Sequence, residues 1–458
     1  MAKKKEKTLE EKLQEALVPE NQWPYMLPEN WCWVKLNKLY HVNPKNIVED
    51  DSVDAAFIPM ANIEPNFIGK YKFEVDSWNK VRKGHTQFAD GDVTFAKISP
   101  CFENGKAFIA ENLPNGIGAG TTELIVLRNR KIVPKYTFYL ISTEKFVNGG
   151  RRTYSGVVGQ QRISMDYVNQ FPIPLPPLPE QKRIVHRIES LFAKLDEAKE
   201  KIQQVLDGAE MRKAAILHKA FTGELTKNWR KENTAIFGNS SLGIDEELIS
   251  DNLKKLPDNW CWCKIGDFLE LKAGKNIKAE NISIEKNDNN KYACYGGNGI
   301  RGYVDSFNVE GTHIIIGRQG ALCGNINIAE NKFYATEHAV VLYPRYDTDI
   351  SWLSENLRFL NLNQYSRSAA QPGLAVKNIN NVLMPVAPYA EQVEMGRLIS
   401  QMLNVWKQKE NICNKVLNKI DTMKKSILAK AFRGELGTNN PTEDSALNFL
   451  KEVLQDKS

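Results

Sequence analysis

The chain has 458 residues, of which 42% are hydrophobic and 25% are charged, and its formal net charge is +6. This length exceeds what one hydrophobic core supports and predicts two to four compact units. The seven cysteines are odd in number and include no C-x-x-C pair, which argues against a disulfide framework and a structural zinc site. No stretch approaches the roughly eighteen apolar residues of a membrane helix and no signal peptide is present, so we expect a cytoplasmic protein.

The N-terminal residues 1–26 predict a charged helical extension with Leu9, Leu13 and Leu17 on one side. Two interpretations are open for this segment. It is either a frayed, solvated end, or it docks against the end of the second helical arm described below and closes the chain on itself.

Residues 27–179 predict a first module of mixed α/β structure. Short β-branched and aromatic runs at 56–60, 93–96 and 122–127 are separated by Gly, Asn and Pro turn signals, and a helical stretch covers 136–147. The module ends in the proline-rich run 173–179, which cannot lie inside a helix because each proline removes an N–H group and fixes φ.

A long helical arm, residues 180–227, follows the proline run. Its apolar positions recur in alternating steps of four and three, a heptad repeat that keeps one seam facing a partner helix. The predicted seam residues of this arm are Ile184, Ile188, Leu191, Leu195, Ile202, Val205 and Ile216.

A polar linker, residues 228–255, leads to a second α/β module at 256–390. Strand-like runs lie at 312–317 and 339–343, and a helix is predicted at 350–362. A second arm covers 391–437 and a short tail covers 438–458. The predicted seam of the second arm contains Met395, Ile399, Met402, Trp406, Val416, Ile420, Met423 and Ile427.

The two halves are an internal repeat. Glu180 matches Glu391 and Gly223 matches Gly434, both 211 positions apart, so the two arms are equal in length. The motif L-P-[ED]-N-W-C-W opens the modules at Leu27 and at Leu256, 229 positions apart. The 18 residues of difference must therefore lie inside the modules, between about 33 and 154.

Enzyme signatures are missing from the sequence. It has no phosphate-binding loop, no G-x-G-x-x-G, no G-x-S-x-G and no H-E-x-x-H. Asp92, Glu103 and Lys106 loosely resemble a nuclease set, but their spacing is wrong and the second module has no counterpart. Gly296–Gly299 is predicted to form a loop, and His338 is predicted to lie in the core. We therefore expect a binding protein with no catalytic residues, no metal and no cofactor of its own.

Polar loops in both modules carry the residue types that contact duplex DNA. Arg pairs with guanine and Gln with adenine in the major groove, while Lys and Ser hold phosphates. A Gln-bearing loop precedes each arm, and a cationic residue follows a strand in each module. The candidate DNA-binding residues are Lys97, Arg151, Arg152, Gln160, Gln161, Arg162, Ser164, Arg318, Gln319, Arg367, Gln371 and Lys377.

Each of the two variable modules begins with L-P-[ED]-N-W-x-W. Each ends in a proline run and E-Q, followed by a heptad helix that closes with [AT]-F-x-G-E-L. In these motifs the chain resembles the specificity subunits of type I restriction–modification systems. The resemblance implies a non-catalytic reader of a bipartite double-stranded DNA target. It also implies two modification subunits that methylate adenine with S-adenosylmethionine, and restriction subunits that use ATP and Mg²⁺.

Two equal arms of about 58 Å, at 1.5 Å per residue, would pack antiparallel and relate the modules by a pseudo-twofold axis. Each module would then read one half-site, and the arm length would set the spacer. Two other functions remain open at this stage. One is a coiled-coil adaptor whose modules bind protein. The other is a fused methyltransferase–specificity protein, which would need a cofactor motif.

Overall fold

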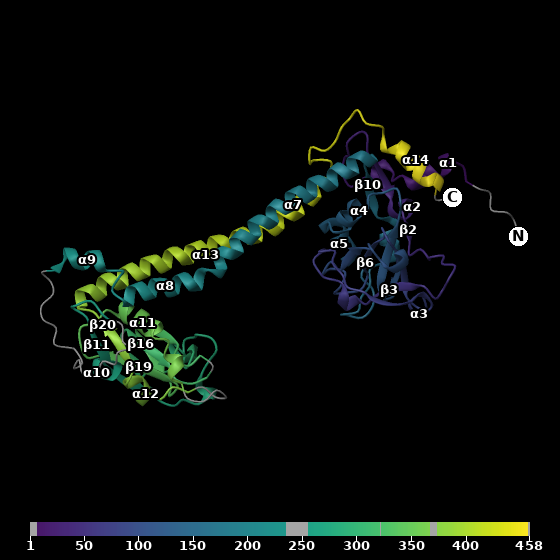
Figure 1. Cartoon of the computed structure of the whole chain (residues 1–458). Helices are drawn as coiled ribbons and strands as arrows, with labels where there is room; N and C mark the ends of the chain where they lie inside the picture. The colour runs from purple at the N-terminus through teal and green to yellow at the C-terminus, as the bar shows by residue number, and fades with distance from the viewer. Residues whose placement is uncertain (1–6, 235–254, 321, 367–372, 457–458) are drawn as a thin grey trace. The chain divides into compact units, whose positions relative to one another are not determined.

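The computed structural model describes residues 7–234, 255–320, 322–366 and 373–456. The chain divides into two compact units. Unit 1 comprises Met1–Lys201 and Lys415–Ser458, and unit 2 comprises Ile202–Asn414. Each unit therefore contains one module together with segments of both arms (Figure 1).

The strands of unit 1 are β1 (Cys32–Lys35), β2 (His41–Val42), β3 (Asp54–Ile58), β4 (Glu74–Ser77), β5 (Thr86–Ala89), β6 (Val93–Ala96), β7 (Ala107–Ile109), β8 (Ile117–Gly120), β9 (Leu124–Arg128) and β10 (Pro172–Leu175). The helices that begin and end within unit 1 are α1 (Leu9–Ala16), α2 (Leu36–Leu39), α3 (Trp78–Val81), α4 (Pro134–Ile141), α5 (Glu144–Arg151), α6 (Met165–Gln170) and α14 (Ala446–Asp456). The strands form sheets in the orders β2-β9-β6-β7 and β4-β3-β8-β5, and β1 pairs with β10.

The strands of unit 2 are β11 (Cys261–Lys264), β12 (Leu269–Ala273), β13 (Tyr292–Gly296), β14 (Gly299–Val304), β15 (Val309–Glu310), β16 (His313–Gly317), β17 (Ile326–Ala329), β18 (Lys332–Ala335), β19 (Ala339–Pro344) and β20 (Leu383–Val386). Its own helices are α8 (Ala209–Phe221), α9 (Lys227–Glu232), α10 (Ile265–Phe268), α11 (Ile350–Phe359) and α12 (Val376–Asn380).

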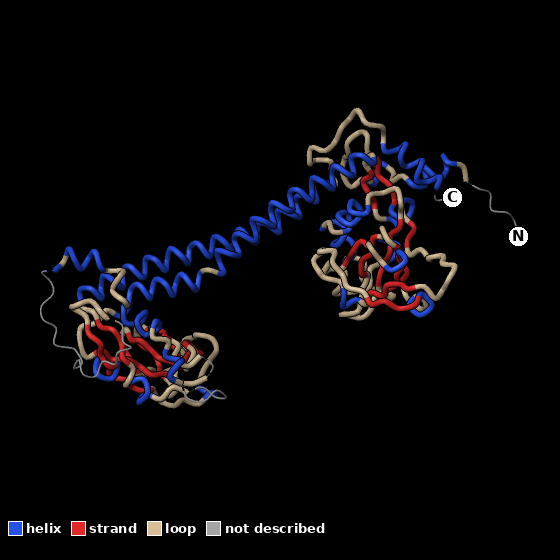
Figure 2. Tube along the Cα trace, viewed as in Figure 1, coloured by secondary structure: helices blue, strands red, loops and turns tan. Residues whose placement is uncertain are grey.

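The sheets of unit 2 repeat those of unit 1 strand for strand. Their orders are β12-β19-β16-β17 and β14-β13-β18-β15, and β11 pairs with β20. In both units the pairing at the same place in the order is parallel, β3 with β8 and β13 with β18. The predicted duplication and the mixed α/β class are confirmed, and Figure 2 shows strands and helices together in each module.

Much of the length difference between the modules lies in one connection. Residues 59–73 join β3 to β4, whereas only Gly297 and Asn298 join β13 to β14. The insertion thus lies in the range that the two repeat offsets predict. A loop between antiparallel strands accepts such an insertion because each doubling of loop length costs only about 0.6 kcal/mol of closure entropy.

The first arm is not one continuous helix, which corrects the expectation from sequence. A single residue, Gly208 with φ −77° and ψ −3°, lies between helix α7 (Leu178–Asp207) and helix α8. Glycine is among the weakest helix formers because it has the most backbone freedom to lose. At the break, the Arg212 guanidinium donates to the Val205 carbonyl at 2.8 Å. The second arm, α13 (Tyr389–Ala431), runs for 43 residues without a break.

Contacts within each unit show that the two arms run antiparallel. In unit 1, Arg183 near the start of α7 donates to the Thr438 carbonyl beyond the end of α13 at 3.0 Å, whereas Asp196 further along α7 pairs with Lys424 within α13 at 2.5 Å. In unit 2, the Arg212 guanidinium of α8 lies 4.9 Å from the Trp406 ring centroid, whereas Thr226 beyond α8 donates to Glu391 near the start of α13 at 2.6 Å. In both units the partner position on α13 falls as the first arm advances.

The predicted seam differs from the observed burial at four positions. Ile184, Ile188, Ile216, Met395, Ile399 and Ile420 are buried, and Leu191, Leu195, Ile202, Trp406 and Ile427 are half-buried. The four exposed seam residues are Val205, Met402, Val416 and Met423, at 37–51%. The half-buried residue beside each of them is Leu206, Leu403, Leu417 or Lys424. The heptad repeat averages 3.5 residues per turn, so a seam position can be reached by a step of three or of four. The sequence pattern alone therefore does not decide which of two adjacent residues faces the partner helix.

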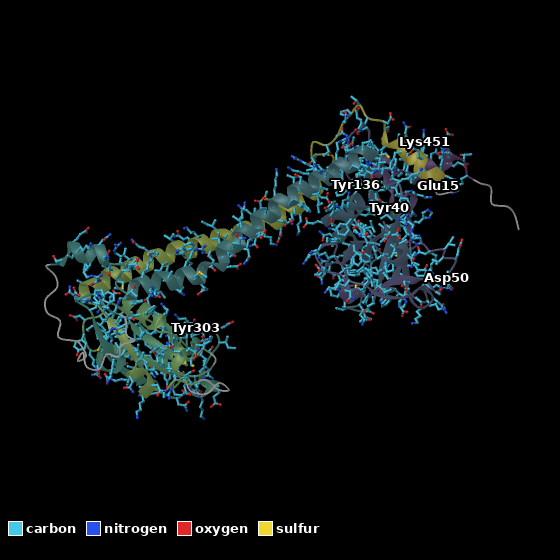
Figure 3. All side chains as sticks on the ribbon, in the orientation of Figure 1. Glu15, Tyr40, Asp50, Tyr136, Tyr303 and Lys451 are labelled. Atoms are coloured by element: carbon cyan, nitrogen blue, oxygen red, sulfur yellow. The ribbon has the colours of Figure 1, made fainter. Side chains whose placement is uncertain are left out.

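The N-terminal helix docks on the C-terminal helix α14, which belongs to the tail, rather than on the end of the second arm as the second interpretation expected. Thr8 and Glu11 form a capping box that starts α1. Helix α1 contacts α14, and Leu9, Leu13 and Leu17 pack against the same core as the buried α14 residues. Helices α1 and α14 therefore both pack on the core of unit 1, and Figure 3 labels Glu15 on α1 and Lys451 on α14.

Each module is fixed to the arms through its opening motif. In unit 1, the Trp31 indole N–H donates to Glu180 Oε2 at 2.7 Å. A Cβ added to Gly434, in the F-x-G-E-L motif that ends the second arm, would lie 2.5 Å from Pro28 Cγ. Only glycine permits this approach. The first module is thus held by the start of its own arm and by the end of the other.

The same junction occurs in unit 2. The Trp260 indole N–H donates to Glu391 Oε2 at 2.9 Å. A Cβ added to Gly223 would lie 2.3 Å from Pro257 Cγ. Two equivalent junctions explain why the entry motif, the E-Q pair and the F-x-G-E-L motif recur together in the sequence.

Candidate nucleic-acid interface

The Gln-bearing loop of unit 1 is a closed, rigidly supported turn. Ser155 and Arg162 close residues 156–161 by donating to each other's carbonyls at 3.1 and 2.9 Å. Gly156 and Gly159 have φ of +107° and +85°, which other residues rarely adopt. The two glycines therefore supply the left-handed backbone of a turn that the Ser155–Arg162 pair closes.

This loop is attached to the residues that follow β6. The Ile163 N–H donates to the Lys97 carbonyl at 3.1 Å, and the Ser99 N–H donates to the Gln161 carbonyl at 2.7 Å. In return, the Gln161 N–H donates to Ser99 Oγ at 3.1 Å. The backbone of Lys97 and the Gln-bearing loop are thus joined directly, an adjacency that the sequence did not predict.

Arg162 supports the loop through an ion pair that the sequence did not indicate. Its guanidinium donates to both carboxylate oxygens of Glu123, at 2.9 Å from Nε and 2.7 Å from Nη2. A third donor, Nη1, reaches the Gln160 carbonyl at 3.0 Å. These hydrogen bonds lower the pKa of Glu123. Most of this guanidinium is therefore occupied within the protein.

Other predicted residues of unit 1 lie close by with different roles. Ser164 caps α6, because its Oγ accepts from the Asp166 N–H at 3.1 Å. Arg151 ends α5 and Arg152 follows it, and both are exposed, as is Gln160. Arginines at this position add positive charge beside the loop.

Sequence reasoning missed the two valines at the tip of the loop. Val157 and Val158 are 79% and 88% exposed. A pair of aliphatic side chains on a glycine-framed polar turn is a feature that the sequence itself shows, between Gly156 and Gly159. Such side chains make apolar contacts with the thymine methyl group in the major groove.

Unit 2 places its candidates at the equivalent end of β16. The Arg318 N–H donates to the His338 carbonyl at 3.0 Å, and the Leu374 N–H donates to the Arg318 carbonyl at 2.8 Å. Gln319 forms a bridge with Gly373. Gly373 stands 211 positions after Arg162, so the bridges Ile98–Arg162 and Gln319–Gly373 fall at the same residue of the repeat.

The remaining candidates of unit 2 are less informative. Lys377 lies on α12 and is exposed. Arg367 and Gln371 lie outside the described residues.

Two open cavities of about 370 and 530 Å³ are both lined by Gln319 and His338, and Arg318 lines the smaller one. The predicted loop Gly296–Gly299 is the turn between β13 and β14 and lines the larger cavity. His338 is not a core residue, contrary to the expectation from sequence. Its side chain is 38% exposed and Nε2 lies 3.2 Å from Glu337 Oε1, because residue 338 precedes β19 rather than lying within it.

The three residues that resemble a nuclease set serve separate structural roles. The Arg128 guanidinium donates to both oxygens of buried Asp92, at 2.9 Å from Nε to Oδ1 and 2.7 Å from Nη2 to Oδ2. Lys106 Nζ donates to the Met60 carbonyl at 2.7 Å, and Glu103 accepts from the Tyr154 hydroxyl. No group of three or more His, Cys, Asp or Glu that could hold a metal occurs among the described residues. The part of the chain described here also contains no helix long and apolar enough to span a membrane.

The family model for the type I restriction modification DNA specificity domain matches residues 28–207 and 257–418, about three quarters of the chain. The chain belongs to this family. The two matches coincide with the two copies of the repeat, and they support sequence-specific DNA recognition within a restriction–modification system as the function of this specificity subunit.

Individual relatives agree with the family. The specificity subunit is 28% identical to the EcoAI specificity subunit of Escherichia coli, over 93% of this chain and 84% of that protein. It is 36% identical to the Escherichia coli EcoEI specificity subunit over 47% of this chain and 37% of that protein.

Solved structures have the same fold. A chain from a study of complex assembly and conformational transition of the type I system has a TM-score of 0.68 at 20% identity, covering 90% of this chain and 100% of that one. The HsdS subunit from Thermoanaerobacter tengcongensis has a TM-score of 0.64 at 19% identity, covering 90% and 99%. These likenesses extend over the modules and the arms of the specificity subunit.

Proposed function

We propose that each module reads one half of a bipartite, asymmetric double-stranded DNA target. The observation that carries this proposal is the equivalence of the two loop attachments, Ile98 with Arg162 and Gln319 with Gly373, on sheets of identical strand order. The frame is the same in both modules, while the side chains that it presents differ. Two half-sites of different sequence are the expected consequence.

The exposed residues divide by role. Lys97, Arg151, Arg152 and Lys377 would bind backbone phosphates and set the position of each module, whereas Gln160 and Gln319 would contact base edges. Arg162 and Ser164 would act indirectly, because their polar groups hold the loop and α6 in place.

The arms would set the distance between half-sites and leave the base pairs between them unread. The specificity subunit would be non-catalytic and act in the cytoplasm. It would direct two modification subunits, which methylate adenine with S-adenosylmethionine, and restriction subunits that use ATP and Mg²⁺. The EcoAI relative is named as a subunit of such an enzyme, which supports this assignment.

Exchange of residues 30–172 for the module of another specificity subunit tests the proposal. Methylated adenines are mapped in cells that contain this chain and its modification subunits. We expect one half-site to change while the other half-site and the spacer stay the same. A change in both half-sites would contradict independent reading.

Two assays on purified protein separate the alternatives. The affinity for duplex DNA should fall log-linearly with salt as counterions are released, whereas an adaptor that binds protein would show no such dependence. The isolated chain should transfer no methyl group to DNA. Methyl transfer without another subunit would show that it carries its own catalytic site.

A further inference from the structure

We propose that Glu337 reads the amino group of a cytosine or an adenine in the half-site of the second module. This inference rests on the proposed function and names one base-contacting group within it. Glu337 lies in the turn between β18 and β19, on the wall of the smaller cavity, beside Arg318 and Gln319.

The turn holds this carboxylate in a fixed position. Thr336 is buried, its carbonyl accepts from the Ala339 N–H at 2.9 Å, and its hydroxyl accepts from the His338 N–H at 3.4 Å. One carboxylate oxygen of Glu337, Oε1, lies 3.2 Å from His338 Nε2. The turn therefore fixes the backbone around Glu337, and His338 contacts one oxygen of its side chain.

The second oxygen of Glu337, Oε2, is buried and has no hydrogen-bond partner among the described residues. A buried acceptor without a donor costs about 1–3 kcal/mol, so a site of this kind gains from a ligand that brings an N–H group. Glu355 also has a buried Oε2 without a partner in the ranges that the structure describes, but its Oε1 pairs with Arg358 on the same helix and it lines neither cavity.

The charge around Glu337 restricts what that ligand is. Arg318 lines the same cavity and Arg301 lines the adjoining one, and neither guanidinium has an ion-pair partner within the described part of the chain. The two cations attract phosphates, whereas the carboxylate repels them. Its partner in a DNA complex must therefore be a donor on a base edge.

The major groove offers such donors on only two bases. Cytosine presents its N4 amino group and adenine its N6 amino group, whereas guanine and thymine present oxygen or nitrogen acceptors and the thymine methyl group. An ionised carboxylate only accepts hydrogen bonds. Glu337 would thus favour an amino-bearing base at one position and reject guanine and thymine there.

The test uses the complex of this chain with its modification subunits and a duplex library in which the target is randomised. The variant Glu337→Gln keeps the size of the side chain and adds a donor. We expect it to lose about tenfold to a hundredfold discrimination at one base pair, within one half-site only, and to bind non-specific DNA more tightly. The matched control is Glu310→Gln, because Glu310 is exposed and pairs with Lys332 away from the cavity. This control should change neither property.

A second measurement separates base contact from a structural role. At the affected position, adenine is replaced by purine or cytosine by 2-pyrimidinone, which removes only the amino group. The wild-type complex should lose about tenfold in affinity and the Glu337→Gln complex almost none. Equal losses in both complexes, or unchanged base preference in Glu337→Gln with intact folding by thermal melting, would overturn the inference. Failure of the wild-type complex to select any half-site would instead refute the proposed function.

Discussion

The indole nitrogen of Trp31 lies 2.7 Å from Glu180 Oε2, although 149 positions separate the two residues in the chain. Glu180 is fully buried, and its Oε2 also accepts from Asn439 Nδ2 at 2.9 Å. One carboxylate therefore joins the opening of the first module, the start of the first arm and the segment after the second arm. The counterpart Glu391 accepts from Trp260 in unit 2.

Removal of this carboxylate should destabilise unit 1. In Glu180→Ala, the buried Trp31 indole N–H loses its acceptor, which costs about 1–3 kcal/mol, whereas half-buried Asn439 keeps its hydrogen bond to Asn30 Oδ1. The free energy of unfolding, measured by urea denaturation, should fall by at least that amount. Glu200→Ala is the control, since Glu200 is exposed on the same helix and its replacement should change stability by less than about 0.5 kcal/mol. Equal stability of the two variants would show that the junction contributes little.

The same carboxyl predicts a pH dependence. Burial raises the pKa of Glu180 above its ordinary value of 4.5. The folded protein therefore retains this proton to higher pH than the unfolded chain does, and stability falls as the pH rises through the folded-state pKa. Relative to Glu180→Gln, which does not titrate, the wild type should lose stability as the pH rises above about 4.5. Urea denaturation of both proteins at several pH values checks this, and a difference that moves in the opposite direction contradicts it.

Close backbone approach at Gly434 gives a second stability prediction. In Gly434→Ala, the new Cβ would lie 2.5 Å from Pro28 Cγ and the residue would keep φ near +75°. Gly437→Ala is a matched control, because Gly437 has φ +69° and no atom lies within 4 Å of its Cβ position. Left-handed backbone costs both variants about 1–2 kcal/mol. Only Gly434→Ala should lose additional stability, and equal melting temperatures would mean that Pro28 moves away without cost.

The features that the sequence predicted well are those that have a period or a repeat. The 211-residue register and the heptads located both arms, because these patterns do not depend on which residues meet in space. The prediction that Met402 rather than Leu403 lies in the seam was wrong, because only the contact between the two helices determines which of these adjacent residues is buried. The break at Gly208 was visible only as a single glycine, whose effect depends on the packing around it.

The candidate site was predicted at the level of loops rather than of atoms. The sequence named Lys97 and the Gln-bearing loop as separate candidates, and their backbone hydrogen bonds became visible only in the structure. Arg162 could not be recognised as a support, because its partner Glu123 lies 39 positions away. Glu337 was missed for a related reason, since an acidic residue in a turn has significance only once the cations around its cavity are known.

The two valines at the tip of the first module's loop should contribute to base preference. Val157→Ser with Val158→Ser removes their exposed apolar surface and leaves the hydrogen bonds between Ser155 and Arg162 unchanged. We expect weaker selection for thymine at one position of the first half-site, by about fivefold or more, and no loss of folding stability. Selection from randomised duplexes measures the first effect and thermal melting the second. An unchanged first half-site would show that the tip does not contact bases.

The length of the arms should determine the spacer between half-sites. Duplication of residues 193–199 in α7 and of residues 421–427 in α13 adds one heptad to each helix near the Asp196–Lys424 ion pair, and this preserves the seam. Seven residues add about 10 Å of helix at 1.5 Å per residue. This corresponds to about three base pairs at 3.4 Å each. Methylation mapping should therefore recover the same two half-sites with a spacer about three base pairs longer.

Duplication in α7 alone is the control, because the unmatched heptad shifts the junction residues out of register and should abolish methylation. An unchanged spacer in the double insertion would show that the helices do not set the distance.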